Sequence, residues 1–306
     1  MVSILEKREL GSTGLMVTAL GFGGAEIGYQ GVDSSAVTKL LNEALDAGLN
    51  VIDTAECYTN GNGTSEELIG QAVSHRRGDY YLFSKCGHAS GIPTPDWAPE
   101  TISSHIDRSL KRLKTDYLDL VQLHSCSLEV LKDGQALAAV QKAQQAGKVR
   151  FIGYSGDNEA AQYAVECGAF ATLQCSLSVV DQSALDVTLP AARAKNMGVI
   201  VKRPIGNAVW RYDERPDNDY IVDYWQRWQL LAFPFKSADS QAIGSVALRF
   251  TLSQPGVSTA IVGTTQPGRW QSNAQTIAEG PLSQEVVTSI RQCWKASAQP
   301  DWTART

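Results

Sequence analysis

Residues 48–58 read Gly-Leu-Asn-Val-Ile-Asp-Thr-Ala-Glu-Cys-Tyr, a short apolar run that ends at Asp53 and is followed by Tyr58. Two similar runs come later, Tyr-Tyr-Leu-Phe-Ser-Lys at 80–85 and Tyr-Leu-Asp-Leu-Val-Gln-Leu-His at 117–124. Short apolar runs of this kind predict buried strands. Each predicted strand ends in a polar residue, and these residues are Asp53, Lys85 and His124.

Strand-like and helix-like runs alternate along the rest of the chain, with a repeat of about 30 residues, the length of a βαβ unit. Eight such units predict a parallel sheet closed into a (β/α)8 TIM barrel. A doubly wound sheet is the alternative, but no GxGxxG opens the first helix. Further strands are predicted at 18–22, 149–154, 170–174, 198–202 and 258–262, and helices at 34–47, 99–113, 134–145 and 241–253.

Two segments depart from the repeat, although we expect residues 1–306 to form a single barrel domain. Residues 10–15 predict the turn of a short hairpin before the first barrel strand. Residues 203–240, after the seventh barrel strand, are predicted to form a long aromatic loop without a clear helix or strand repeat, with room for short helices. We expect a flap over the barrel mouth that lines a substrate pocket, with a satellite core on the barrel flank as the alternative. Its aromatic residues are Trp210, Tyr212, Tyr220, Tyr224, Trp225, Trp228, Phe233 and Phe235.

The composition narrows the classes of partner. The formal net charge is −5 and 43% of residues are hydrophobic, so we expect a large core and neither nucleic-acid nor membrane binding. The six cysteines form no CxxC pair, which favours reduced thiols in a cytoplasmic protein. With four histidines and no HExxH motif, no metal site is expected.

Parallel barrels gather their chemistry at the carboxyl ends of the strands, where Asp53, Lys85 and His124 are predicted to lie. A phenol such as Tyr58 has a reference pKa of ~10. A Lys ammonium beside it is expected to lower that pKa, and a carboxylate beside the Lys to keep the ammonium charged. These four groups are the components needed to protonate a carbonyl oxygen while hydride reaches its carbon.

The same residues and their flanking sequence resemble the aldo-keto reductases over about residues 10–273. Asp53, Tyr58, Lys85 and His124 stand at the positions of that family's catalytic tetrad, and the words at 48–55 and at 65–70, Ser-Glu-Glu-Leu-Ile-Gly, match as well. The resemblance implies that Tyr58 is the general acid and that His124 orients the carbonyl. Lys85 would lower the pKa of Tyr58, and Asp53 would pair with Lys85.

The resemblance also implies a nicotinamide cofactor, NADP(H), with NAD(H) possible. Ser155 and Gln174 would hold the nicotinamide carboxamide, and Gly23 and Gly24 would let the backbone approach the cofactor closely. The loop after the eighth barrel strand would bind the adenosine phosphates, and the residue at 273 would bind adenine. The residues of that adenosine side are Gly263, Thr264, Thr265, Arg269 and Asn273.

Three positions differ from the pattern of many family members. Gly156 follows Ser155 where many members have Asn, and Leu177 stands where many have a Tyr stacked on the nicotinamide. Gly263 replaces a Lys found in some NADPH-specific members. With Arg269 as the remaining cation, the prediction is a moderate preference for NADPH over NADH.

The resulting expectation is an NAD(P)H-dependent reductase of aldehydes or ketones. Two alternatives remain: a nucleotide-binding regulatory subunit of a channel, and a Schiff-base barrel lyase that uses Lys85 or Lys202. Tyr29, Trp97 and Trp210 are the predicted substrate-pocket residues. The sequence does not identify the carbonyl substrate or the oligomeric state.

Overall fold

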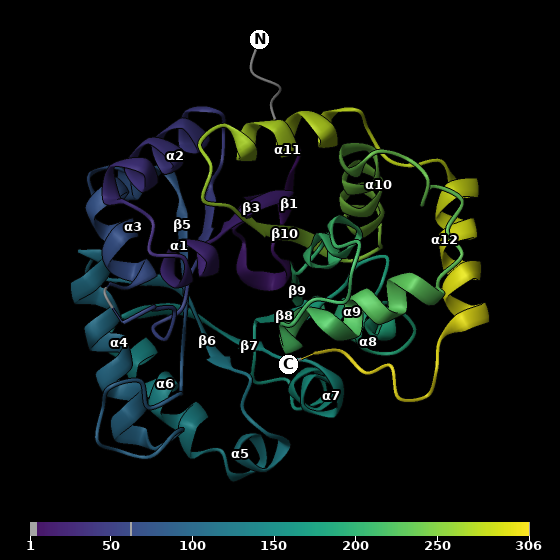
Figure 1. The fold of residues 1–306 in the computed structure, drawn as a ribbon. Coiled ribbons are helices and arrows are strands. Elements are labelled where there is room, and N and C mark those ends of the chain that lie inside the picture. The colour runs from purple at the N-terminus through teal and green to yellow at the C-terminus, as the bar shows by residue number, and fades with distance from the viewer. Residues whose placement is uncertain (1–4, 62, 306) are drawn as a thin grey trace.

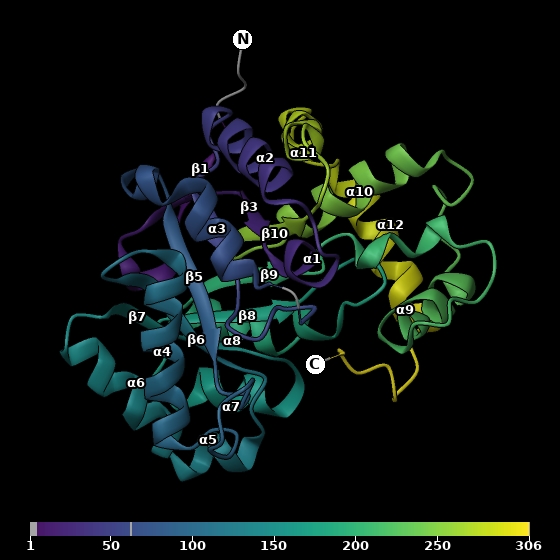
Figure 2. The same cartoon turned by 60° about the vertical axis from the view of Figure 1, so that its left-hand side comes forward.

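A computed structural model describes residues 5–61 and 63–305. Eight parallel strands close into a barrel in the order β10-β3-β4-β5-β6-β7-β8-β9, and helices surround them (Figures 1 and 2). The predicted (β/α)8 TIM barrel is confirmed. The barrel strands are β3 (Leu20–Gly23), β4 (Val51–Asp53), β5 (Tyr81–Cys86), β6 (Leu118–His124), β7 (Val149–Ser155), β8 (Thr172–Ser176), β9 (Gly198–Lys202) and β10 (Val257–Gly263).

The helices begin where the sequence offers capping groups. Thr64 and Glu67 form a reciprocal capping box at the start of α3, which satisfies backbone N–H groups that lack a helical partner. Pro99 opens α4, which has the predicted bounds. The helices are α1 (Ala25–Tyr29), α2 (Ser34–Asp46), α3 (Ser65–Val73), α4 (Pro99–Leu113), α5 (Leu128–Asp133), α6 (Gln135–Gln145), α7 (Asn158–Glu166), α8 (Thr188–Ala194), α9 (Asp219–Leu230), α10 (Ser240–Leu252), α11 (Arg269–Ala278) and α12 (Gln284–Ser297), with 3-10 turns η1 (Gly11–Thr13), η2 (Ser74–Asp79), η3 (Ser183–Leu185) and η4 (Gly206–Arg211).

The predicted N-terminal hairpin closes the amino end of the barrel. Strands β1 (Lys7–Glu9) and β2 (Met16–Thr18) pair antiparallel around η1. The Ser12 N–H donates to the Asn196 carbonyl at 2.9 Å, just before β9 begins. Gly11 has φ +54°, and a Cβ there would come within 2.2 Å of the Gly198 backbone nitrogen. Leu10, Leu15 and Val17 of the hairpin pack with strand residues that include Val51, Phe83, Leu120, Ile200 and Ile261.

The predicted aromatic loop at 203–240 contains a full helix, α9. Its buried side chains join those of α10 and α12 in a second hydrophobic cluster, separate from the main core between strands and helices. Short helices were expected within this segment, and α9, with 12 residues, is longer than that expectation. Tyr224 and Trp228, four residues apart, are buried on the same helix, so a helical period was present in the sequence.

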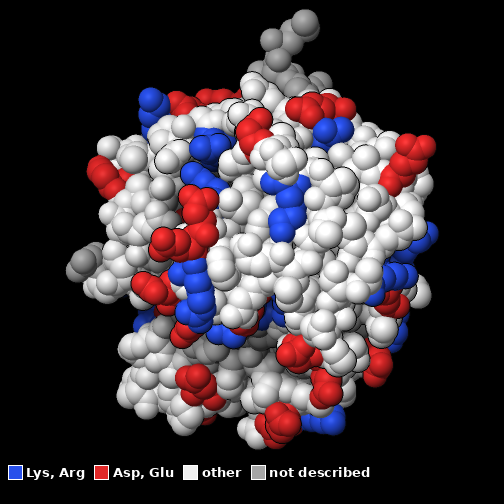
Figure 3. Space-filling model, turned by 45° about the vertical axis from the view of Figure 1, so that its right-hand side comes forward, with Lys and Arg blue, Asp and Glu red and all other residues white. Residues whose placement is uncertain are grey.

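Acidic and basic side chains are interspersed on the face shown in Figure 3. Such mixing creates no large field of one sign on that face. Among the helices that the structure describes, none is long and apolar enough to cross a membrane.

Candidate active site

Strand register brings the predicted catalytic residues to one end of the barrel. Asp53 pairs with Gly23 across β4 and β3, Lys85 pairs with Gln122 across β5 and β6, and His124 pairs with Ser155 across β6 and β7. These pairs lie at or next to the carboxyl ends of their strands. Because the strands are parallel and neighbours in one barrel, their ends meet around one mouth.

Lys85 is the centre of the cluster, although its side chain is only 1% exposed. Its ammonium Nζ ion-pairs with the Asp53 carboxylate, donates to the Thr54 carbonyl at 2.8 Å, and lies 3.2 Å from the Tyr58 hydroxyl. A buried ammonium is stable only when paired and hydrogen-bonded. The three partners meet that requirement and direct the charge at the phenol.

The second Asp53 oxygen is held by two buried amides. Gln122 and Gln174 donate through Nε2 to Asp53 Oδ2, at 3.2 and 2.8 Å. Ser155 Oγ donates in turn to Gln174 Oε1 at 3.2 Å. Of the predicted cofactor residues, Gln174 therefore contacts the tetrad directly, and Ser155 is linked to it through Gln174. Gln122 was missed, although its position two residues before His124 on an inward-facing strand is a signal for it.

The two aromatic members of the tetrad are both uncharged. Burial, followed by the Asp53 charge, raises the pKa of Tyr58 well above its usual value. The expected pKa of Tyr58 below its usual value is therefore not found in this structure, because loss of hydration disfavours the phenolate. Burial and the nearby Lys85 charge hold the pKa of His124 well below its usual value. Tyr58 thus keeps its proton at neutral pH, and His124 is a neutral imidazole.

Glu56 anchors the loop that carries Tyr58 to β5 and α4. The Glu56 N–H donates to the Lys85 carbonyl at 3.2 Å, and Arg112 Nη1 donates to the Glu56 carbonyl at 3.2 Å and to its carboxylate at 2.9 Å. Arg108 also ion-pairs with Glu56. These contacts fix the loop between β4 and α3, and with it the position of the phenol.

Aromatic rings surround the tetrad on one side. Tyr29 lies 5.4 Å from Tyr58, His88 lies 5.3 Å from His124, and Trp97 lies 5.0 Å from His88, measured between ring centroids. Tyr29 and Trp97, two of the predicted pocket residues, are therefore at the mouth. His88, which carried no expected role, is there too.

Trp210 occupies a different environment from the one predicted. Its ring packs 5.7 Å from Trp228, and its Nε1 donates to Ser240 Oγ at 3.2 Å. Both partners belong to or flank the second hydrophobic cluster. This position favours the satellite-core alternative for Trp210. The hydroxyl of Tyr220, in the same segment, instead accepts a hydrogen bond from Arg203, which directly follows β9.

The loop after β10 presents polar groups around the N-terminus of α11. Arg269 is exposed at the first position of α11, and within the described residues its guanidinium has no hydrogen-bond or ion-pair partner. The Glu26 carboxylate lies against Gly263, so that a Cβ at 263 would come within 1.5 Å of it. Asn273, Thr264 and Thr265 are partly exposed. The Arg269 guanidinium and the Glu26 carboxyl group therefore lie at the same end of the barrel.

The loop after β9 was predicted as part of a flap over the substrate pocket, but not as a cofactor contact. Arg203, Gly206, Asn207 and Ala208 all have positive φ, which is costly for residues other than glycine and is concentrated at functional sites. Within the part of the chain that the structure describes, Arg203 Nε and Asn207 Nδ2 are buried without a hydrogen-bond partner, as is Gln271 Oε1 on α11. The unsatisfied donors of Arg203 and Asn207 fit an anionic ligand such as a phosphate-bearing cofactor.

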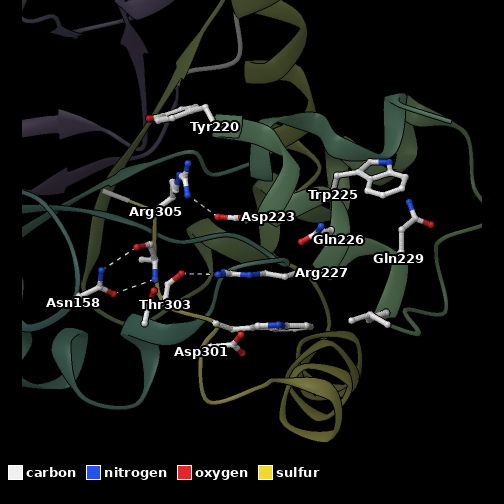
Figure 4. A pocket seen from close by; sticks show the side chains of 13 residues that line it. Asn158, Tyr220, Asp223, Trp225, Gln226, Arg227, Gln229, Asp301, Thr303 and Arg305 are labelled. Carbon is white, nitrogen blue, oxygen red and sulfur yellow. Dashed lines mark hydrogen bonds and ion pairs between the residues drawn. The ribbon is translucent and has the colours of Figure 1, made fainter. Parts of the chain in front are cut away.

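A cavity of about 940 Å³ lies beside the mouth, between α9 and the C-terminal segment 301–305 (Figure 4). Asn158 and Ala304 exchange two hydrogen bonds, at 2.9 and 3.0 Å, and Arg305 pairs with Asp223 at 2.9 Å. The tetrad does not line this cavity. Among the described residues, no cluster of His, Cys, Asp and Glu is grouped to hold a metal ion.

Comparison with known proteins places this site in a family. The model of the Aldo/keto reductase family matches residues 19–295, and the chain belongs to that family. L-galactose dehydrogenase of Arabidopsis thaliana is 28% identical over 94% of this chain and 93% of its own length. NADH-specific methylglyoxal reductase of Escherichia coli is 24% identical over 94% of this chain and 100% of its own length. The holo form of an aldo-keto reductase from Bacillus halodurans superposes with a TM-score of 0.82 at 25% identity, covering 97% of this chain and 99% of that one. This protein is therefore an oxidoreductase of the aldo/keto reductase family, whose members use nicotinamide cofactors.

Proposed function

We propose that this protein reduces aldehydes or ketones to alcohols with NADPH or NADH, and that Tyr58 is the general acid. The observation that carries the proposal is the chain of contacts from Asp53 through Lys85 to the Tyr58 hydroxyl. A neutral phenol is a useful proton donor only if the charge it leaves behind is stabilised. The Lys85 ammonium, 3.2 Å away, is placed to do so.

In the proposed reaction the cofactor supplies the hydride, and the protein supplies the proton and positions the carbonyl group. A reduced nicotinamide supplies the hydride that reaches the carbonyl carbon. Tyr58 gives its proton to the carbonyl oxygen, Lys85 holds the phenolate that results, and solvent restores the proton. His124, neutral and at the end of β6, donates a hydrogen bond that orients the same oxygen. Asp53 keeps Lys85 in place.

The residues present fit a dinucleotide. Ser155 and Gln174 would hold the nicotinamide carboxamide beside the tetrad, and Gly23 and Gly24 would allow close approach of the ring. Thr264, Thr265, Arg269 and Asn273 would bind the adenosine half. Arg269 favours a 2′-phosphate, whereas the Glu26 carboxylate beside Gly263 opposes it. We therefore expect the preference for NADPH to be small.

The pocket for the carbonyl substrate would be lined by Tyr29 and Trp97. The Tyr29 ring packs near Tyr58, and the Trp97 ring packs against His88, which lies beside His124. Tyr29 is 53% exposed. Such walls suit an apolar or aromatic group attached to a small carbonyl.

The test is to follow oxidation of NADPH and of NADH with a panel of aldehydes, ketones and sugars. Turnover that depends on the carbonyl and disappears in the Tyr58→Phe variant supports the proposal. A tightly retained nucleotide with very slow turnover on every carbonyl would instead support a regulatory nucleotide-binding role. Substrate trapped on Lys85 or Lys202 by borohydride would support a Schiff-base lyase.

A further inference from the structure

Cys57 touches the catalytic imidazole but has no part in the chemistry described above. It lies in the loop after β4, one residue before Tyr58, and its Sγ is 3.4 Å from His124 Nδ1. Within residues 5–61 and 63–305, it is the only hydrogen-bond partner of the His124 ring. The neighbouring rings of Tyr58 and His88 make edge contacts, with centroids 5.7 and 5.3 Å away.

The direction of this hydrogen bond follows from the two groups. Burial raises the pKa of the Cys57 thiol to about 11, so sulfur keeps its hydrogen at neutral pH. Burial lowers the pKa of His124, so the ring carries one N–H and one bare nitrogen. A bare imidazole nitrogen is a good acceptor and a thiol sulfur is a weak one. These preferences favour a thiol that donates to Nδ1 and an imidazole hydrogen on Nε2.

We propose that Cys57 is a positioning residue, whose S–H donates to His124 Nδ1 and holds the imidazole in the tautomer with its hydrogen on Nε2. In the proposed function, on which this inference rests, that Nε2–H is the group that donates to the carbonyl oxygen. With the other tautomer, Nε2 would present a lone pair to the oxygen and repel it. The hydrogen bond also limits rotation of the ring about χ2.

The experiment compares Cys57→Ala and Cys57→Ser with wild type. ¹⁵N NMR of the histidine side chains identifies which ring nitrogen is protonated, and a His124→Asn spectrum assigns the His124 signals. Cys175→Ala is the matched control, because Cys175 is a buried cysteine that packs in the main core between strands and helices. It has no contact with His124 among the residues that the structure describes.

We expect Nδ1 of wild-type His124 to be an unprotonated acceptor. Cys57→Ser, which keeps an O–H donor, should preserve both this signal and turnover. Cys57→Ala should mix the tautomers and lower kcat by about three- to tenfold, the value of one net hydrogen bond, with cofactor affinity unchanged. Cys175→Ala should change neither.

A wild-type spectrum with the proton on Nδ1 would overturn the proposal, as would a Cys57→Ala variant with unchanged kcat. The spectra are recorded without substrate. They therefore report on the Cys57–His124 contact even if no carbonyl compound is reduced, and that second failure would count only against the proposed function.

Discussion

The tetrad and the aromatic segment at 203–240 lie beside the same barrel mouth and differ in how their side chains are held. Asp53, Lys85 and His124 are at or next to strand ends and Tyr58 is in the loop after β4, where Lys85 contacts Asp53, Thr54 and Tyr58. The aromatic segment packs into the second hydrophobic cluster with α10 and α12, and Trp228, Phe233 and Phe235 are in mutual contact. Polar groups fixed by strand register predict chemistry, whereas a high density of aromatic residues predicts only that they are buried somewhere. The two regions should therefore respond differently to mutation.

Replacing Tyr58 by Phe should have the largest effect. Loss of the general acid is expected to lower kcat by about 10²–10⁴-fold, while the dissociation constant of NADPH and the melting temperature change little. Single-turnover reduction and cofactor titration measure the two quantities. A decrease of less than about tenfold would assign the proton to another group.

Replacing Trp228 by Ala should give the opposite result. Trp228 is 5% exposed, and loss of a buried Trp costs about 3–5 kcal/mol of unfolding free energy. The order of preference among carbonyl substrates should stay the same. Trp210→Ala, at a less buried ring of the same cluster, should destabilise the protein less. Unequal changes of KM across substrates of different size would instead place Trp210 in the substrate pocket.

Lys85→Met should lower kcat by about 10²–10³-fold, comparable to the loss of one preorganised donor at a developing charge. The burial that raises the pKa of Tyr58 would remain without the compensating ammonium. Because the phenolate would be less stable, alkaline conditions should not restore the rate. Asp53 would lose its partner, so Lys85→Met combined with Asp53→Asn is the control for stability. A Lys85→Met enzyme with the rate and pH profile of wild type would exclude coupling between Lys85 and Tyr58.

Arg269→Ala should have the smallest effect. An exposed cation contributes little, so binding of NADPH is expected to weaken about two- to fivefold, with NADH unchanged and with a smaller difference at high salt. Glu26→Gln should act in the opposite direction and strengthen NADPH. Equal losses for both cofactors would assign Arg269 to a part of the dinucleotide that they share.

Several parts of this fold could be predicted because one physical rule dominated each. Residues 99–113 begin with a proline and carry a single apolar face, and α4 has those bounds. Asp53, Lys85 and His124 end buried strands, where a charged or polar group needs a functional or ionic partner. In both cases local sequence and tertiary structure impose the same requirement.

Other parts depended on contacts that sequence spacing does not show. Cys57 contacts His124, which is 67 positions away in the sequence, and Gln122 on β6 contacts Asp53 on β4 across the intervening strand β5. The raised pKa of Tyr58 was not predicted, because it comes mainly from burial. That burial depends on all the residues around the barrel mouth, which the local sequence around Tyr58 and Lys85 does not show. The strained loop after β9 could not be predicted from a glycine-rich motif, because most of its positive φ values fall on residues other than glycine.

The hairpin that closes the amino end of the barrel constrains the order in which the cofactor and the substrate bind and leave. Leu10, Leu15 and Val17 fill the barrel interior at that end, so every molecule that reaches Tyr58 must enter and leave through the opposite opening. A nicotinamide ring held by Ser155 and Gln174 would lie deeper than a carbonyl compound between Tyr29 and Trp97. The deeper molecule must then arrive first and depart last, and a single compound lodged in that opening would exclude both.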